Sequence, residues 1–206
     1  LVTAGAAIGA STNPLETAVG VLSAKTTTGS IFVSEADAVT VDAVSLSVNR
    51  VAADGSTATT GTAASQEDLV SGGDLVLVTV NGGITTTVST GEITAAQDLL
   101  LSTGESAEAT VADVVLNAAL SSAGGHISVI SKDGVSLNHA TADVTTAGGT
   151  VDVQADAGVA MVDGAVITST GGAVRVQALG GDVTVGEIAA GTGSVALLAS
   201  GSVLDL

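Results

Sequence analysis

Apolar and polar residues alternate in short runs along most of the chain, and the runs recur at a nearly fixed distance. After residue 124 each run follows a glycine pair, at 124–125, 148–149 and 171–172. Counted from the second glycine of each pair, the spacing is first 149 − 125 = 24 and then 172 − 149 = 23, and Gly193 follows at 193 − 172 = 21. A period of this length with strand patterning predicts a β-solenoid.

The repeats align into columns with one apolar residue per coil. The first predicted strand has two columns, Ile127, Val151, Val174 and Val195, and Val129, Val153, Val176 and Leu197. The second strand also has two, Val135, Val159, Val183 and Val203, and Leu137, Met161 and Val185. A shorter third strand is predicted with Val144, Val166 and Ile188 facing inward. Columns spaced by two positions, on three strands per turn, predict an all-β fold, a three-sided parallel β-helix of about 21–24 residues per coil.

The same pattern extends upstream in a looser form. Residues 72–95 begin another coil, and Gln97 follows Gly73 at a spacing of 97 − 73 = 24. Three alternating runs are also predicted after Gly29, formed by Ile31, Val33, Val39, Val41, Val44, Leu46 and Val48. Parallel strands joined by crossovers predict a right-handed coil. About eight such coils would stack over roughly 40 Å.

Residues 49–68 interrupt the repeat. They carry no sustained apolar period and are rich in Gly, Ser, Thr and Asp. Insertions in solenoids project from corners, because added chain there leaves the stack intact. We therefore predict a polar loop or hairpin at 49–68, within a single β-helix segment that spans 1–206 and belongs to a longer protein.

Composition and charge narrow the range of possible binding partners. The formal net charge is −17, with only four basic residues, Lys25, Arg50, Lys132 and Arg175. Nucleic acid is a poor partner, because phosphate binding needs clustered Lys and Arg. We expect no membrane insertion, since the apolar runs are short and interrupted. The chain has no cysteine, which excludes disulfides and thiolate sites.

Few residues of the chain are candidates for a catalytic role. His126 and His139 are separated in the sequence by 139 − 126 = 13 and are predicted to be surface residues on different faces of one coil. The acidic pair Glu67-Asp68 falls in the irregular segment. Sugar-cleaving sites pair carboxylates and commonly use aromatic platforms, but the chain has neither Tyr nor Trp. We therefore expect that the chain is not an enzyme, and we predict no catalytic, cofactor or metal site residues.

Two weaker possibilities concern the polar residues. Glycine pairs followed by Asp, at 72–74 and 180–182, resemble part of the calcium-binding nonapeptide but lack its tandem spacing. Weak calcium association through Asp54, Asp156, Asp163 or Asp182 is the most that this pattern predicts. Ser and Thr also recur before each glycine pair, at 121–122, 145–146 and 168–169. We interpret them as hydroxyls that bond along the corner of the stack, and we disfavour a flat ice-binding array.

The columns of glycine pairs and alternating valines, together with residues 8–33 (IGASTNPLETAVGVLSAKTTTGSIFV), carry a family resemblance. The chain resembles large secreted bacterial surface proteins of the filamentous-haemagglutinin-like type over most of its length. The resemblance implies a long right-handed β-helical shaft, exported to the cell surface, that presents adhesive regions away from the membrane.

These observations favour a structural and adhesive role. We expect a rigid extracellular stalk or filament shaft on a bacterial cell surface, whose partners are neighbouring coils of the same polypeptide or like molecules end to end, and a host, cell or matrix surface. One alternative is a self-assembling filament subunit. Another is a carbohydrate-active β-helix in which 49–68 builds a cleft around Asp54 or Glu67.

Overall fold

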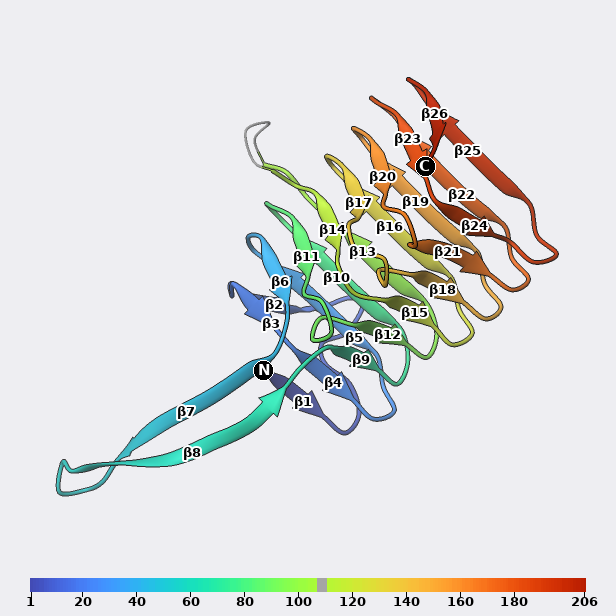
Figure 1. Ribbon diagram of the computed structural model, residues 1–206. Helices are drawn as coiled ribbons and strands as arrows, with labels where there is room; N and C mark the ends of the chain where they lie inside the picture. The colour runs from blue at the N-terminus through green and yellow to red at the C-terminus, as the bar shows by residue number, and fades with distance from the viewer. Residues whose placement is uncertain (107–110) are drawn as a thin grey trace.

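The chain winds through three parallel sheets in a fixed order and repeats that circuit eight times (Figure 1). The structure is a computed structural model that describes residues 1–106 and 111–206. Each sheet contains eight strands, one from every coil, so the described chain forms a parallel β-solenoid. The predicted three-sided β-helix is confirmed.

The three sheets are numbered by the order in which the chain first enters them. Sheet 1 contains β1 (Val2–Ala4), β4 (Ala24–Thr26), β9 (Leu69–Ser71), β12 (Ile93–Ala95), β15 (Leu120–Ser122), β18 (Val144–Thr146), β21 (Val166–Ser169) and β24 (Glu187–Ala189). Sheet 2 contains β2 (Leu15–Thr17), β5 (Ile31–Glu35), β10 (Leu75–Thr79), β13 (Leu99–Ser102), β16 (Ile127–Ser131), β19 (Val151–Ala155), β22 (Val174–Ala178) and β25 (Val195–Ala199). Sheet 3 contains β3 (Val21–Leu22), β6 (Val39–Val41), β11 (Ile84–Thr86), β14 (Val114–Leu116), β17 (Val135–Leu137), β20 (Val159–Met161), β23 (Val183–Val185) and β26 (Val203–Asp205).

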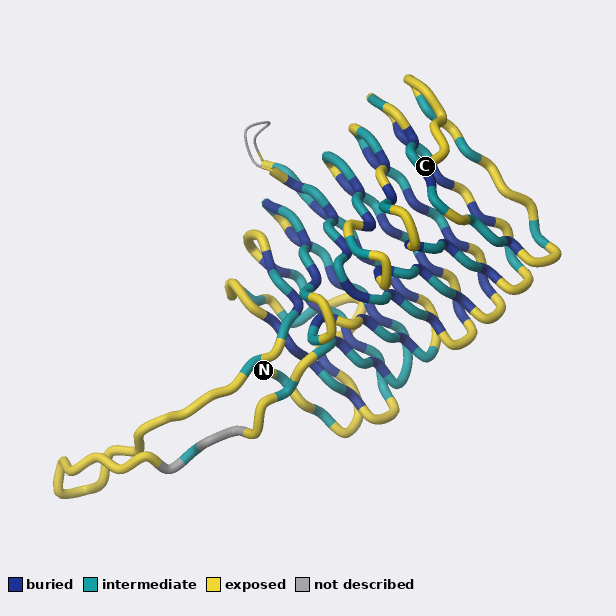
Figure 2. The backbone as a smooth tube through the Cα atoms, viewed as in Figure 1, coloured by how far each residue is buried: buried dark blue, intermediate teal, exposed yellow. Residues whose placement is uncertain are grey.

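The predicted columns lie in register in sheets 2 and 3. Val151 pairs with Ile127 on one side and with Val174 on the other, and Val159 pairs with Val135 and Val183. Val129, Val153 and Val176 are fully buried. The core is therefore a ladder of stacked aliphatic side chains along the inside of the coils (Figure 2).

In sheet 1, one predicted inward residue is wrong. Val144 pairs with Ile167, and Ile167 is 0% exposed while Val166 is only partly buried. Both residues are apolar, so the pattern alone leaves the phase of this strand open. The inward phase is the one that also buries Ser169, whose hydroxyl oxygen accepts a hydrogen bond from the Gly172 amide at 2.8 Å.

Two coils are longer than the predicted range. In one, the irregular segment lies between the paired residues Ile31 and Leu75, whose positions differ by 75 − 31 = 44. In the other, Leu99 and Ile127 are paired counterparts in sheet 2, and their positions differ by 127 − 99 = 28. This coil includes residues 107–110, which lie outside the described part of the chain. The neighbouring circuit, from Leu75 to its partner Leu99, has the predicted spacing of 99 − 75 = 24.

The irregular segment forms an antiparallel hairpin of β7 (Val44–Val51) and β8 (Thr57–Gln66). Figure 1 shows it projecting from the stack near the end where β1 lies. The predicted third run of that coil, with Val44, Leu46 and Val48, is wrong, because these residues belong to β7. Leu46 and Val48 are 54% and 46% exposed, and β9 supplies the sheet 1 strand of that coil. Alternation with period two is the same in a hairpin and a coil, so it could not separate them.

Candidate functional site

The corner between sheets 1 and 2 is held by buried hydroxyls. Thr146 Oγ1 donates to the Gly125 carbonyl of the preceding coil at 2.6 Å and accepts from the Gly149 amide of its own coil at 3.2 Å. Ser169 repeats this with the Gly149 carbonyl at 2.7 Å. The expected bonding of these hydroxyls along the stack is therefore present, and the buried hydroxyl is the second of each Ser/Thr pair.

The second glycine of each pair is required by close backbone approach. A Cβ on Gly149 would overlap the carbonyl of Gly125 directly below it, and a Cβ on Gly172 would overlap the Gly149 carbonyl. By contrast, a Cβ on Gly171, the first glycine of its pair, would meet nothing within 4 Å. The repeat therefore marks a corner at which successive coils touch through their backbones.

Six aspartates join successive coils through one recurring geometry. Each lies immediately before a strand or at the equivalent position, and its Oδ1 accepts the amide of the counterpart residue in the next coil. The pairs are Asp68 with Glu92 (3.0 Å), Asp74 with Asp98 (3.3 Å), Asp98 with His126 (2.7 Å), Asp113 with Gly134 (2.7 Å), Asp143 with Val166 (2.9 Å) and Asp182 with Ser202 (2.6 Å). Much of the acidic charge is thus used to hold backbone amides.

The candidate calcium carboxylates do not converge. Asp182 is one of the aspartates that bind an amide, and Asp156 pairs with Lys132 at 3.4 Å. Asp54 accepts the amide and hydroxyl of Ser56 in the hairpin turn. Hydrogen bonds to Ser56 lower the pKa of Asp54. Within residues 1–106 and 111–206, no three His, Asp or Glu side chains are grouped so as to hold a metal ion.

A buried glutamate lies at the corner between sheets 2 and 3, near the N-terminal end of the stack. Glu35 is 0% exposed, and its carboxylate accepts the Thr17 hydroxyl at 2.6 Å and the amides of Val19 and Ala36 at 2.9 and 3.1 Å. Both carboxylate oxygens therefore bind groups of the corner itself, which assigns Glu35 a structural role.

Three of the four basic residues join neighbouring coils. Lys25 pairs with Asp68 at 3.8 Å, and Lys132 pairs with Asp156. Arg175 binds both carboxylate oxygens of Asp152 at 2.8 and 2.7 Å, and this contact raises the pKa of Arg175. The fourth, Arg50, is exposed on β7, and no ion pair of Arg50 is found among the described residues.

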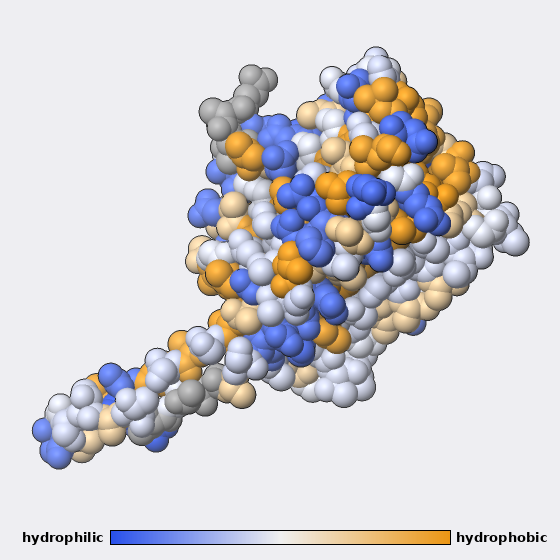
Figure 3. All heavy atoms as spheres, in the orientation of Figure 1, coloured by the Kyte–Doolittle hydropathy of each residue, from blue (hydrophilic) through white to orange (hydrophobic). Residues whose placement is uncertain are grey.

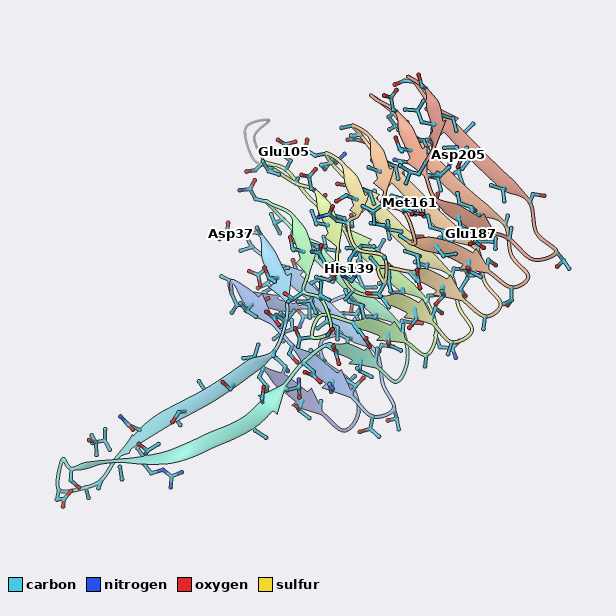
Figure 4. The ribbon with its side chains drawn as sticks, viewed as in Figure 1. Asp37, Glu105, His139, Met161, Glu187 and Asp205 are labelled. Atoms are coloured by element: carbon cyan, nitrogen blue, oxygen red, sulfur yellow. The ribbon has the colours of Figure 1, made fainter. Side chains whose placement is uncertain are left out.

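The histidines and the remaining acids are dispersed. His126 Nδ1 lies 3.0 Å from Thr150 Oγ1 of the next coil, whereas His139 Nδ1 contacts Thr141 within its own corner at 2.8 Å. Figure 4 shows Asp37, Glu105, Glu187 and Asp205 at separate places along the stack. Neither histidine contacts one of these four acids in the described part of the chain.

Three surface hollows lie on sheet 3 and at the base of the hairpin. Two, of about 280 and 320 Å³, lie on the outer face of sheet 3 and share Asp113. A third, of about 510 Å³, lies at the base of the hairpin, where Lys25, Gln66 and Glu67 contribute to its lining. Glu67 and Asp54 cannot act as a pair there, because β8 separates them by about 30 Å at 3.3 Å per residue, whereas paired glycosidase carboxylates lie roughly 5–10 Å apart.

The last coil exposes the inward columns. Val195 and Val203 are 47% and 48% exposed, whereas their counterparts one coil earlier, Val174 and Val183, are 1% and 0% exposed. Figure 3 shows hydrophobic residues gathered at this end of the molecule. β24, β25 and β26 are the terminal strands of their sheets, so each has one free edge in this structure.

None of the described residues belongs to a helix that is long and apolar enough to cross a membrane. Comparisons of the chain with models of protein families, with curated proteins and with solved structures gave no match in any of the three.

Proposed function

We propose that this chain is a stiff shaft segment of a large extracellular protein on a bacterial surface. The observation that carries the proposal is the continuity of the contacts between coils. Each circuit is bonded to the next through three parallel ladders, and buried hydroxyls and six aspartates add bonds at the corners. A column joined on every side resists bending and keeps whatever it carries at a fixed distance.

The surface chemistry supports the same role. The net charge of −17 favours solubility of an exposed shaft, and three basic side chains are engaged in joining coils. The hairpin of β7 and β8 is the part of the chain that projects farthest from the stack in Figure 1. It is therefore the segment that we assign to contact with a host, cell or matrix surface.

The location can be tested with antibodies raised against residues 44–66. Intact cells that make the protein should be labelled as strongly as permeabilised cells, because the hairpin projects into the medium. An antibody against a cytoplasmic protein, which should label only permeabilised cells, is the control. Labelling of the hairpin that requires permeabilisation would contradict the proposal.

A second candidate is a filament subunit whose molecules stack end to end through strand edges such as those of β24, β25 and β26. Val195 would be buried by a further coil as Val174 is, but Asp205 occupies the inward position held by Val185. If molecules stack at this end, Asp205→Val should strengthen association in sedimentation velocity and Val195→Lys should abolish it. If the wild-type protein and the Asp205→Val variant both stay monomeric at all concentrations, that result would contradict the stacking.

A further inference from the structure

We infer that the hairpin carries a specific processing site, the Arg50–Val51 peptide bond, for trypsin-like serine endopeptidases. These enzymes accept Arg or Lys on the amino side of the bond that they hydrolyse, because an aspartate at the bottom of their specificity pocket binds the cation. Only Lys25, Arg50, Lys132 and Arg175 in this chain meet that requirement. The inference concerns the hairpin alone and does not depend on the proposed shaft function.

Three of the four positions are protected by the stack. Lys25 and Arg175 lie within β4 and β22, which have strand neighbours on both sides. The Lys132 amide donates to the Thr103 hydroxyl of the preceding coil at 2.9 Å. An endopeptidase must bind several residues in extended form, so cleavage at these positions requires a whole coil to open.

Arg50 also lies in a strand, where it pairs with Ala58, but this strand has a neighbour on one side only. Its strand, β7, pairs only with β8, and an isolated two-stranded hairpin is of marginal stability in water. Arg50 is exposed, Val51 is 67% exposed, and the turn at 52–56 follows directly. In that turn the Ala52 amide donates to the Ser56 carbonyl at 2.8 Å, and Gly55 has a positive φ of 81°. The Arg50–Val51 bond adjoins this exposed turn, and exposed loop tips are preferred sites of proteolytic nicking.

Hydrolysis at this bond would leave the stack intact. Water adds across the Arg50–Val51 peptide bond, giving a carboxylate on Arg50 and an amino group on Val51. The two new ends remain attached to β6 and β9, which are held in sheets 3 and 1 by their own ladders. The product is a nicked but assembled column with two free arms in place of a closed hairpin.

Limited digestion of the folded chain with trypsin tests this inference. We expect one early cut, with fragments 1–50 and 51–206 identified by mass spectrometry. The fragments should co-elute in size-exclusion chromatography and separate only in guanidinium chloride. Arg50→Gln should slow the first cut at least about 100-fold, because the remaining sites open only with the coils, whereas Lys132→Gln should be cut at the wild-type rate.

A change of protease specificity distinguishes the site from general loosening. Arg50→Lys should become sensitive to a lysine-specific endopeptidase that leaves the folded wild-type chain uncut, with circular dichroism confirming that each variant is folded. First cleavage after Lys25, Lys132 or Arg175 would overturn the inference. Fragments that separate without denaturant, or a native chain that resists trypsin while the unfolded chain is cut, would overturn it as well.

Discussion

Thr146 and Gly125 lie on successive coils, and the buried Thr146 hydroxyl donates a 2.6 Å hydrogen bond to the Gly125 carbonyl. The same hydroxyl accepts the Gly149 amide, so one side chain joins two corners of the stack. Equivalent hydroxyls at Ser122 and Ser169 continue this row. The corner between sheets 1 and 2 is therefore polar inside, although it adjoins an aliphatic core.

Replacing that hydroxyl by a methyl group should destabilise the fold. Thr146→Val keeps the shape of the side chain but leaves the Gly125 carbonyl and the Gly149 amide without this partner, which costs about 1–3 kcal/mol. Urea unfolding would measure the loss. Thr145→Val on the outer face of the same strand is the control, and an equal loss in both variants would show that the buried bonds are unimportant.

The two glycines of a pair should respond differently to substitution. Gly149→Ala places a methyl group against the Gly125 carbonyl and should cost about 1–3 kcal/mol or more through overpacking. Gly171→Ala meets open space and should change stability by less than about 0.5 kcal/mol. Thermal unfolding of both variants would test this, and equal melting temperatures would argue against close contact between the coils.

The aspartates that bind amides should act as acceptors and not through their charge. Asp113→Ala removes the bond to the Gly134 amide at 2.7 Å and should cost about 1 kcal/mol. Asp113→Asn keeps an oxygen acceptor and should retain most of the stability. Urea unfolding of the two variants separates these cases, and equal losses would indicate that the carboxylate charge matters instead.

Asp42 supplies a pH-dependent term with a defined sign. Hydrogen bonds from the Thr90 hydroxyl, then from the Ala43 amide, lower the pKa of Asp42 below its ordinary value of 3.8. Its stabilisation is therefore present above pH 3.8 and is lost as the pH falls through the lowered pKa. Thr90→Val should raise the pKa of Asp42, and NMR titration of its carboxyl carbon would report this. The stability difference between the two proteins should shrink in acid, and a constant difference would contradict the assignment.

The coil columns were predictable because each repeat supplies a β-branched or long aliphatic residue at the same offset from a glycine. The prediction was wrong at Val166 and at Val44, where the residues around them allow either strand phase or either kind of strand. In both places tertiary contacts decide the outcome. At the first it is the buried Ser169 hydroxyl, and at the second it is pairing with β8.

The aspartates that join coils were missed, although a signal exists in the sequence. Asp74, Asp98, Asp113 and Asp182 each stand directly before the first apolar residue of a strand. The hydrogen bond itself depends on which residue of the next coil lies above, and only the register fixes that. The roles of the basic residues were missed as well, because these roles depend on the charges that the stack places beside them.

The stiffness of the column is the central claim, and distances between spin labels on sheet 2 test it most directly. The chain has no cysteine, so pairs of cysteines that carry the labels can be introduced at outward positions of one column. The pairs combine Ser34 with Gln154, Gln177 or Leu198. These pairs span four, five and six ladder steps, so the distances should rise by about 4.8 Å each, from roughly 19 to 29 Å. Narrow distributions with equal increments would support a stiff shaft. Broad distributions, or distances that fail to increase, would contradict it.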